Sequence, residues 1–513
     1  MNRCQKTTKV FRGFAALAAF AIAQVACSTS RPEQKTETAP GDQVQASAPA
    51  AALTPDEGFR AQKPPPLQRI SRFMAPVPTQ RRLKNGVPVL VVEDHQVPLV
   101  SIEVMIKTGV NGEPVAKAGL STLVASTLTE GTKSRTASQF AEELENLAAE
   151  ISARSEQSST RIHLHCLSET LKPAMDLLAD AVQRPAFRGD DLERMRGLQL
   201  TTLRHKRSTP EALARDEMDR RLYGPRHPWG QPVGGTERSV QALSRQDLVS
   251  FHEAWYRPNN AVISVAGDVS TDEVVKALDE KLATWKAKPI RALQPPKFPS
   301  LAARSISMME VSGATQSQIW VGGRLFRADH PDALPMQVGN LILGGLFTSR
   351  LNQNLREDKG YSYGVFSITT LGPTTGTLIA VGGVISKNTV EALVEYEKEL
   401  ERFSNGDFTN QELSQAKAAS IGRLPSRLET TDSVAEAMNS LVLNRLPLDY
   451  FRALPSRTSR LGKDEVARAI RKYVAPRQWP VVVVGPIQAD QDRIRQLGLG
   501  PVELRPLTVA SRP

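Results

Sequence analysis

Residues Leu341–Gly364, LILGGLFTSRLNQNLREDKGYSYG, are the stretch from which the organisation of the chain can be worked out. The pattern predicts a helix that ends at a Gly-Gly turn, a second helix over about 349–357, a break at Gly360 and the start of a strand. This order places Arg356 near a helix C-terminus and Tyr363 just after a tight bend, so the two side chains can converge. Both donate hydrogen bonds, as a site for a peptide carbonyl or an oxyanion requires. On spacing alone, a structural role explains them better, with Arg356 paired to a neighbouring acid and Tyr363 half-buried in a strand.

The two halves of the chain repeat one plan of strands and helices. Ile102 and Gly267 lie 165 positions apart in the first half, and Ile319 and Gly485 lie 166 positions apart in the second. The sequence therefore predicts an α+β protein of two homologous repeats, 80–287 and 305–490, each an antiparallel-rich mixed sheet with helices packed on it. Residues 288–304, which are rich in Pro, form the expected linker, and 491–513 form a tail.

The N-terminus predicts export from the cytoplasm. In residues 1–26, four basic residues precede an uncharged, largely apolar run that is too short to span a bilayer comfortably. It ends at Ala26-Cys27, which resembles a bacterial lipoprotein cleavage site, although Gln24 stands where Leu is usual. We therefore expect a lipid on Cys27 and a location on the periplasmic side of the envelope, at the outer membrane. Ordinary signal cleavage, giving a soluble periplasmic or secreted protein, is the alternative.

Composition describes the rest of the chain. Residues 27–79, rich in Pro, Ala, Gln, Thr and Glu, predict a disordered or extended tether. Removal of the signal lowers the formal net charge from +11 to +7, a modest excess for so long a chain. With 40% hydrophobic, 23% charged and only 5% aromatic residues, the body is typical of a soluble globular protein and argues against a nucleic-acid platform.

Few residues outside the Arg/Tyr pair are candidates for a catalytic, metal-binding or phosphate-binding role. Cys166 alternates with apolar residues in a strand-like run, which favours burial over a nucleophilic role. His163 and His165 can bind a metal from one strand face, but with no acidic or Cys ligand evident nearby a solvated face is the simpler interpretation. His252-Glu253 lacks a second His at the needed spacing, where Tyr256 stands. The Gly-Gly pairs lack the following Lys-Ser/Thr of a phosphate loop.

Several motifs in one order carry a resemblance to a known family. They are LKNGVPVLVVED (83–94), GL and EGT framing 119–132, PAF (185–187), HPWGQPVGGTE (227–237), FHEAWYRPNNAVISVAGD (251–268) and GGLFTSRLNQNLREDKGYSYG (344–364). Over about residues 80–490 the chain resembles the pitrilysin/insulinase zinc peptidases, in the subgroup of mitochondrial processing peptidase-like proteins. The resemblance implies that the two repeats form half of a clamshell.

The family's zinc motif, His-x-x-Glu-His, is absent. In the register of the resemblance, Thr122 and Ser126 stand at the two His positions and Ala125 at the Glu position. The third ligand, a Glu in a later helix, should fall near 199–203, where QLTTL has no acid. No two of the seven histidines stand four residues apart. The resemblance therefore implies no zinc site and no other cofactor in this chain, which would be inactive alone.

The resemblance gives Arg356 and Tyr363 a function. In the family, an Arg and a Tyr of the second repeat bind substrate opposite the zinc, and in two-chain members they lie on a different polypeptide from the metal. We therefore expect a non-catalytic subunit of a heterodimeric zinc endopeptidase, paired with a zinc-motif paralogue that acts on peptides. The alternative is a pseudopeptidase that serves as a peptide-binding or scaffold protein. An autonomous hydrolase that uses Cys166 or a Ser is a third possibility, but no nucleophile-base pair is visible.

Overall fold

The structure, a computed structural model, describes residues 73–506 except 291, 294–296 and 302–303. The expected signal, Cys27, most of the tether and the last residues of the tail lie outside the described residues. Within the described ranges, no helix combines the length and apolar character needed to cross a membrane.

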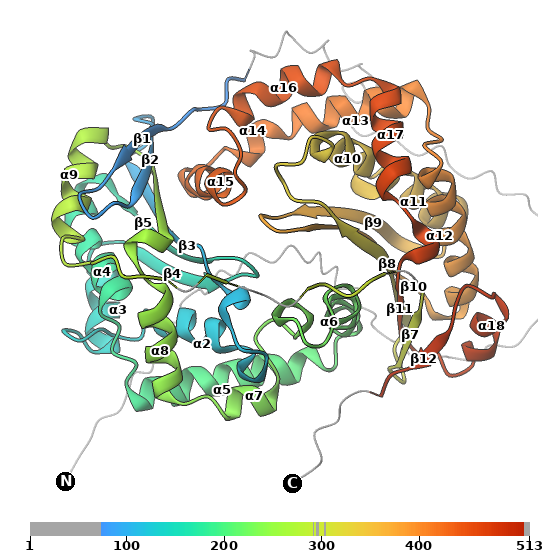
Figure 1. Ribbon diagram of the computed structural model, residues 1–513, viewed down its shortest axis with the longest axis horizontal. Coiled ribbons are helices and arrows are strands. Elements are labelled where there is room, and N and C mark those ends of the chain that lie inside the picture. Colours follow the sequence, from blue (N-terminus) through green and yellow to red (C-terminus); the bar gives the residue numbers. More distant parts are fainter. Residues whose placement is uncertain (1–72, 291, 294–296, 302–303, 507–513) are drawn as a thin grey trace, which may run out of the picture. The chain divides into compact units, whose positions relative to one another are not determined.

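The first repeat is a six-stranded mixed sheet with helices packed on it (Figure 1). The strands run in the order β1-β2-β6-β3-β5-β4, and β2 pairs with β6 in parallel while the other neighbours are antiparallel. The strands are β1 (Thr79–Arg82), β2 (Pro88–Glu93), β3 (Leu99–Ile106), β4 (Glu150–Ser155), β5 (Thr160–Leu167) and β6 (Ala261–Gly267). The helices are α2 (Leu120–Thr127), α3 (Ala137–Asn146), α4 (Leu171–Gln183), α5 (Gly189–Lys206), α6 (Pro210–Tyr223), α7 (Glu237–Gln241), α8 (Arg245–Trp255) and α9 (Thr271–Lys281).

The second repeat has a sheet of the same plan, in the order β12-β7-β11-β8-β10-β9. Its strands are β7 (Ile306–Glu310), β8 (Gln316–Leu325), β9 (Ser362–Leu371), β10 (Gly376–Ile385), β11 (Val481–Gly485) and β12 (Val502–Leu504). Its helices are α10 (Ala333–Asn340), α11 (Arg350–Asn352), α12 (Thr389–Ser404), α13 (Asn410–Gly422), α14 (Leu424–Arg427), α15 (Thr431–Leu443), α16 (Tyr450–Arg460), α17 (Lys463–Tyr473) and α18 (Gln491–Gln496), with π-helical turns at Leu341–Gly345 and Gln353–Asp358. The predicted α+β fold with two matching repeats is confirmed.

The two sheets differ in the origin and direction of one edge strand, β1 in the first sheet and β12 in the second. In the first sheet β1 precedes β2 in the chain and pairs with it antiparallel, whereas β12 comes from the C-terminal end and pairs with β7 in parallel. The boundary expected at residue 490 therefore falls too early. The segment expected as a tail contributes α18 and an edge strand to the second repeat.

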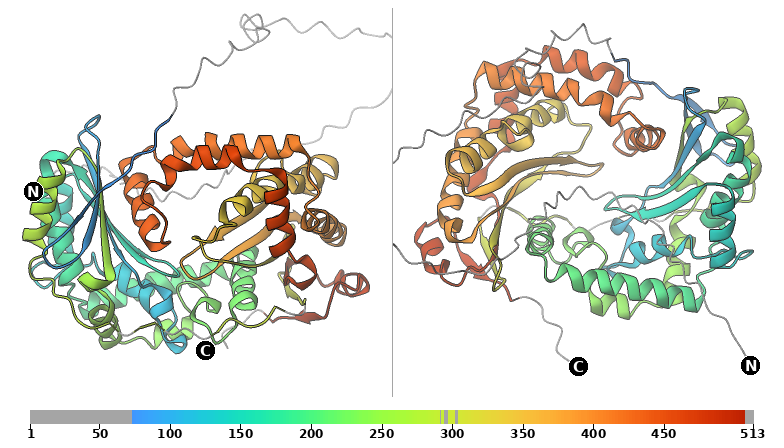
Figure 2. Two further views of the ribbon diagram at one scale, coloured as in Figure 1. Left: turned by 45° about the horizontal axis from the view of Figure 1, so that its top comes forward. Right: turned by 180° about the vertical axis from the view of Figure 1, so that it is seen from behind.

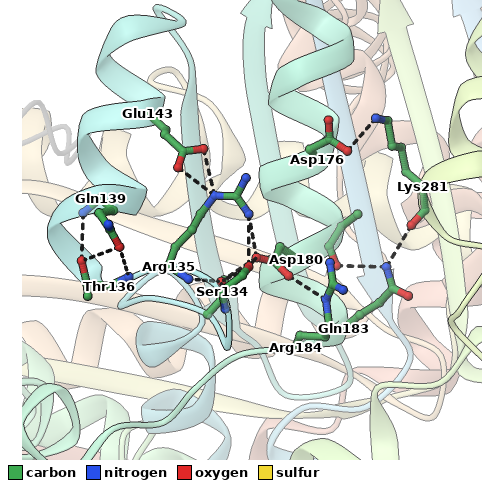
Figure 3. Close-up of polar contacts among 12 residues, drawn as sticks. Ser134, Arg135, Thr136, Gln139, Glu143, Asp176, Asp180, Gln183, Arg184 and Lys281 are labelled. Atoms are coloured by element: carbon green, nitrogen blue, oxygen red, sulfur yellow. Dashed lines mark hydrogen bonds and ion pairs between the residues drawn. The ribbon is translucent and has the colours of Figure 1, made fainter.

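A buried carboxylate fixes the loop that follows α2 (Figure 3). Asp180 of α4 accepts hydrogen bonds from Thr132 (2.5 Å), Ser134 (2.6 Å), Arg135 (2.8 Å) and Arg184 (2.7 Å). Burial alone would raise the pKa of Asp180, but these hydrogen bonds and the charge of Arg184 outweigh it and hold the pKa below its ordinary value. Helix α2 itself ends at Thr127, before this loop.

The two repeats exchange one helix each (Figures 1 and 2). Helix α6 of the first repeat packs against β8 and β11 of the second, while α15 of the second repeat packs against β3 and β6 of the first. The α6 contact is largely apolar: Met218 and Leu222 share a cluster with Trp320, Val482 and Val484. At about 25 cal/mol per Å² of apolar surface removed from water, such burial couples the repeats strongly.

Hydrogen bonds and one buried ion pair join α15 to the first sheet. Ser264 Oγ donates to the Ala435 carbonyl (2.6 Å), and Asn439 Nδ2 donates to the Glu103 backbone oxygen (2.9 Å) and to Oε1 (3.0 Å). Arg161 Nη1 lies 2.6 Å from the same Oε1, and Arg161 Nη2 donates to Ser440 Oγ (3.1 Å). Because buried polar groups are costly without partners, this network fixes one register of α15 on the sheet.

His252 is a core residue rather than a metal ligand. It is buried on α8, its Nε2 lies 2.9 Å from the Val182 carbonyl oxygen, and its ring lies 4.5 Å from that of Tyr256. The Tyr that replaces a second His at this spacing therefore packs against it. Burial lowers the pKa of His252 to about 4.

We expect His252 to make the fold sensitive to acid. Its folded pKa, about 4, lies below the unfolded value of 6.5, so the unfolded chain binds more protons between these values and stability falls as pH drops from 6.5 towards 4. The loss from this residue is on the order of 3 kcal/mol. His252→Gln, which keeps a donor for Val182, should flatten urea-unfolding free energies over this window. His205→Gln, at an exposed position, is the matched control variant, and an unaltered slope in His252→Gln would refute this assignment.

Candidate functional site

The residues expected at the positions of the family's zinc motif line a pocket of about 340 Å³. Thr122, Ala125 and Ser126 reach it from α2, and Gln199 and Thr202 reach it from α5. The structure thus brings the degenerate motif together with the segment where the third ligand was expected.

The chemistry of this pocket does not suit zinc. None of the described residues that line it is His, Cys, Asp or Glu, and its charged members are Arg154 and Lys206. Gln199 Nε2 donates to the Gly234 carbonyl (2.7 Å), while Gln199 Oε1 and Thr122 Oγ1 are buried without a hydrogen-bond partner among the described residues. Neutral oxygens beside two cations cannot replace the imidazole and carboxylate ligands that zinc requires. The residues present therefore do not fit the metal.

Arg356 and Tyr363 lie together on the second repeat. The Arg356 Cζ atom is 4.8 Å from the centroid of the Tyr363 ring and 4.5 Å from that of Phe347. Arg356 Nε also lies 3.1 Å from Glu357 Oε1, so the neighbouring acid considered from the sequence is present. Tyr363, however, is 76% exposed rather than half-buried. These cation–π contacts and the Glu357 pair hold the guanidinium in place, which leaves its two Nη groups as donors for a ligand.

The backbone around the pair explains how these side chains meet. The π-helical turn Gln353–Asp358 carries Arg356, and Gly360, with φ +64°, reverses the chain into β9. Buried Asn352 bridges the two flanks, because its Nδ2 donates to the Phe347 carbonyl (2.7 Å) and its Oδ1 accepts from the Val365 amide (3.3 Å). The expected helix at 349–357 is present, but it passes from α to π geometry at Gln353, and π turns are frequent at functional sites.

Sequence reasoning missed the apolar surface beside the pair. Phe347, Phe366 and Ile368 are exposed, and the last two lie on β9, the edge strand of its sheet. An edge strand presents unpaired backbone groups, and exposed apolar side chains on it are unusual unless another chain covers them. The alternation of exposed Phe366 and Ile368 with buried Val365 and Ser367 is a strand pattern that the sequence already contained.

Cys166 does not form a nucleophilic site. It is buried on β5, and burial raises the pKa of its thiol to about 12. Because the thiolate is the reactive species, we expect no labelling of Cys166 by iodoacetamide at pH 8 in the folded protein, and complete labelling in denaturant. Mass spectrometry of the Cys166 peptide measures this. Rapid labelling of the native protein would restore the cysteine hydrolase as a candidate.

The expectation of a solvated face at His163 and His165 is wrong. Both side chains are partly buried because α15 of the other repeat packs there, and it brings Asp432 within hydrogen-bond distance of both rings. An acidic neighbour 267 residues away along the chain could not be recognised from local spacing.

Comparison with known families assigns both repeats. Residues 88–236 match the insulinase family (peptidase family M16), and residues 242–420 match the peptidase M16 inactive domain. Together the matches span more than half of the chain.

Individual relatives agree with this assignment. The chain is 26% identical over 351 residues to an uncharacterized zinc protease, YmxG, of Bacillus subtilis, covering 68% of this chain and 84% of that protein. It is 26% identical over 392 residues to the non-peptidase homolog YmxG of Helicobacter pylori, covering 75% and 89%.

Solved structures share the fold. A peptidase M16 inactive domain from Pseudomonas fluorescens matches with a TM-score of 0.74 at 24% identity, over 80% of this chain and 98% of that one. A chain of complex III2 from Candida albicans matches with a TM-score of 0.69 at 18% identity, over 82% and 99%. With the zinc-binding residues replaced and both repeats matched, the chain belongs to the insulinase (M16) family, as a member without the family's catalytic residues.

Proposed function

We propose that this chain is the non-catalytic subunit of a heterodimeric zinc endopeptidase. Its partner would be a paralogue that carries His-x-x-Glu-His, and this chain would supply Arg356 and Tyr363 to the partner's site. The observation that carries the proposal is the contrast between the two sites: the zinc pocket is lined by no zinc ligand, while Arg356 and Tyr363 lie adjacent, Tyr363 exposed and Arg356 half-buried.

The two side chains would have different roles toward the substrate. Arg356, stacked on two aromatic rings, would orient a substrate backbone carbonyl or carboxylate through its free N–H groups. The Tyr363 hydroxyl would donate to the scissile carbonyl oxygen as negative charge develops there. An extended peptide would lie along β9, the edge strand of its sheet, and Phe366 and Ile368 would contact its apolar side chains.

A pseudopeptidase scaffold is the second candidate. The Helicobacter pylori relative is named a non-peptidase homolog, and a chain of the Candida albicans complex III2 shares the fold. The exposed edge strand would then bind a peptide or a partner without cleavage. Under this function Arg356 and Tyr363 would influence no peptidase.

The proposal includes a place in the cell envelope. A lipid on Cys27, followed by the tether, would hold the body at the periplasmic face of the outer membrane, with soluble periplasmic protein as the alternative. Incorporation of labelled palmitate that is lost in Cys27→Ala distinguishes the two.

The test is peptidase activity on a library of unstructured peptides, with this chain alone, the zinc-motif paralogue alone, and the two together. We expect cleavage only in the mixture, and co-elution of both chains in gel filtration. Full activity of the paralogue alone, with no change on addition of this chain, would leave the scaffold function.

A further inference from the structure

Three metal-ligating side chains from the two repeats meet where α15 packs on the first sheet. His163 and His165 lie on the same face of β5, and Asp432 lies in the first turn of α15. One nitrogen of each ring and one carboxylate oxygen lie within 4.8 Å of one another. We propose that His163, His165 and Asp432 bind a divalent transition metal, with zinc as the first candidate, that links the two repeats.

The distances suit a tetrahedral metal after a small adjustment. His163 Nε2 lies 3.0 Å and His165 Nδ1 lies 2.8 Å from Asp432 Oδ1. Ligand atoms about 2.0–2.2 Å from a tetrahedral zinc ion stand about 3.3 Å apart, so these two N···O pairs need to separate by only a few tenths of an ångström. The two ring nitrogens, which lie within 4.8 Å of each other, would take the same spacing. Metal binding would replace the two N···O hydrogen bonds, with each imidazole carrying its proton on the other ring nitrogen.

The surroundings of the three ligands support a metal site. Ser101 Oγ on β3 contacts the Asp432 carboxylate and also lies 2.7 Å from Thr431 Oγ1 and 3.2 Å from His165 Nδ1. Hydroxyl partners of this kind orient a ligating carboxylate. The Asp432 side chain is 48% exposed, so a metal could enter from solvent and keep a water as its fourth ligand.

This site is separate from the lost zinc motif and needs none of its residues. Two imidazoles and one carboxylate suit zinc, copper or nickel better than magnesium or calcium, which prefer all-oxygen sites. The metal would join β5 to α15, two elements far apart in the chain. Since the ligands come together only in the folded chain, binding would stabilise the packing of the repeats.

The test is zinc titration of the purified, EDTA-treated protein by isothermal calorimetry, with cobalt absorption spectra as a second readout. We expect one zinc per chain, an unfolding midpoint that rises with added zinc, and the visible bands of tetrahedral cobalt. His163→Gln, His165→Gln and Asp432→Asn should each weaken zinc binding at least tenfold. Asp432→Asn keeps a hydrogen-bond acceptor, and circular dichroism in EDTA should find it folded.

The matched control is His95→Gln. His95 Nδ1 lies 2.7 Å from Asp268 Oδ1, so it forms a His–Asp pair of similar geometry but without a second imidazole. Its loss should leave the stoichiometry and affinity unchanged. The absence of zinc binding by the unaltered protein, or equal binding by Asp432→Asn, would overturn the site and leave the three residues as a hydrogen-bonded latch. Neither result would bear on the proposed peptidase function.

Discussion

Tyr363→Phe should reduce the kcat of the reconstituted two-chain peptidase about 100-fold, with little change in KM. The substitution removes one hydroxyl donor, and loss of a single donor to a developing oxyanion costs about 10²–10³ in rate. Arg356→Ala should lower kcat/KM by about ten- to a hundredfold, chiefly through KM, because it removes a charge-assisted contact to the substrate. Steady-state kinetics on a fluorogenic peptide measures both.

Two control variants separate the proposed roles from general damage. Tyr361→Phe makes the same change two residues away, at a partly buried position, and should keep full activity. Arg356→Lys keeps the positive charge but loses the planar guanidinium, so its kcat/KM should lie between those of the wild type and Arg356→Ala. A peptidase that tolerates both Tyr363→Phe and Arg356→Ala would show that the pair takes no part in the reaction.

Arg161→Met should destabilise the fold by about 3–5 kcal/mol. Arg161 and Glu103 form an ion pair whose side chains are 5% and 1% exposed, and removal of one partner leaves a buried charge uncompensated. The same carboxylate holds Asn439 of α15, so the change should also loosen α15 from the first sheet. Urea unfolding measures the free energy, and hydrogen exchange over residues 431–443 measures the loosening.

Arg154→Met is the matched control for this prediction. Arg154 lies on the neighbouring strand β4 and pairs with Glu156 and Glu436, but it is 49% exposed, so its loss should cost about 1 kcal/mol or less. The double variant Glu103→Leu/Arg161→Met should recover much of the lost stability, because no unpaired charge remains. Equal effects of Arg161→Met and Arg154→Met would contradict the importance of the buried pair.

Most helices and strands of the two repeats could be predicted from the sequence, because each one follows a local pattern of apolar and turn residues. The strand Ala261–Gly267, the helix from about Asp190 to Lys206 and the strands flanking 371–377 follow from apolar periodicity and turn residues. The exchange of α6 and α15 between the repeats was not predictable, since it depends on contacts between segments far apart in the chain. For the same reason, the contact of Asp432 with the two histidines of β5 could not be predicted.

In the candidate site, too, some contacts could be predicted from the sequence and others could not. The Gly360 bend and the strand after it predicted that Arg356 and Tyr363 converge, and the structure places them 4.8 Å apart, measured from Cζ to ring centroid. Phe347 stacks on the Arg356 guanidinium, and its backbone is held in position because buried Asn352 donates a hydrogen bond to the Phe347 carbonyl. Spacing alone does not show that a buried Asn side chain binds a carbonyl five residues before it.

We propose that this chain completes the active site of another chain. The most direct measurement is a titration of this chain into a fixed concentration of the zinc-motif paralogue, with peptide cleavage as the readout. We expect negligible cleavage without this chain and a rise to a plateau at one equivalent. With Tyr363→Phe, the kcat at the plateau should be about 100-fold lower. Cleavage by the paralogue alone at the plateau rate, unchanged by any amount of this chain, would contradict it.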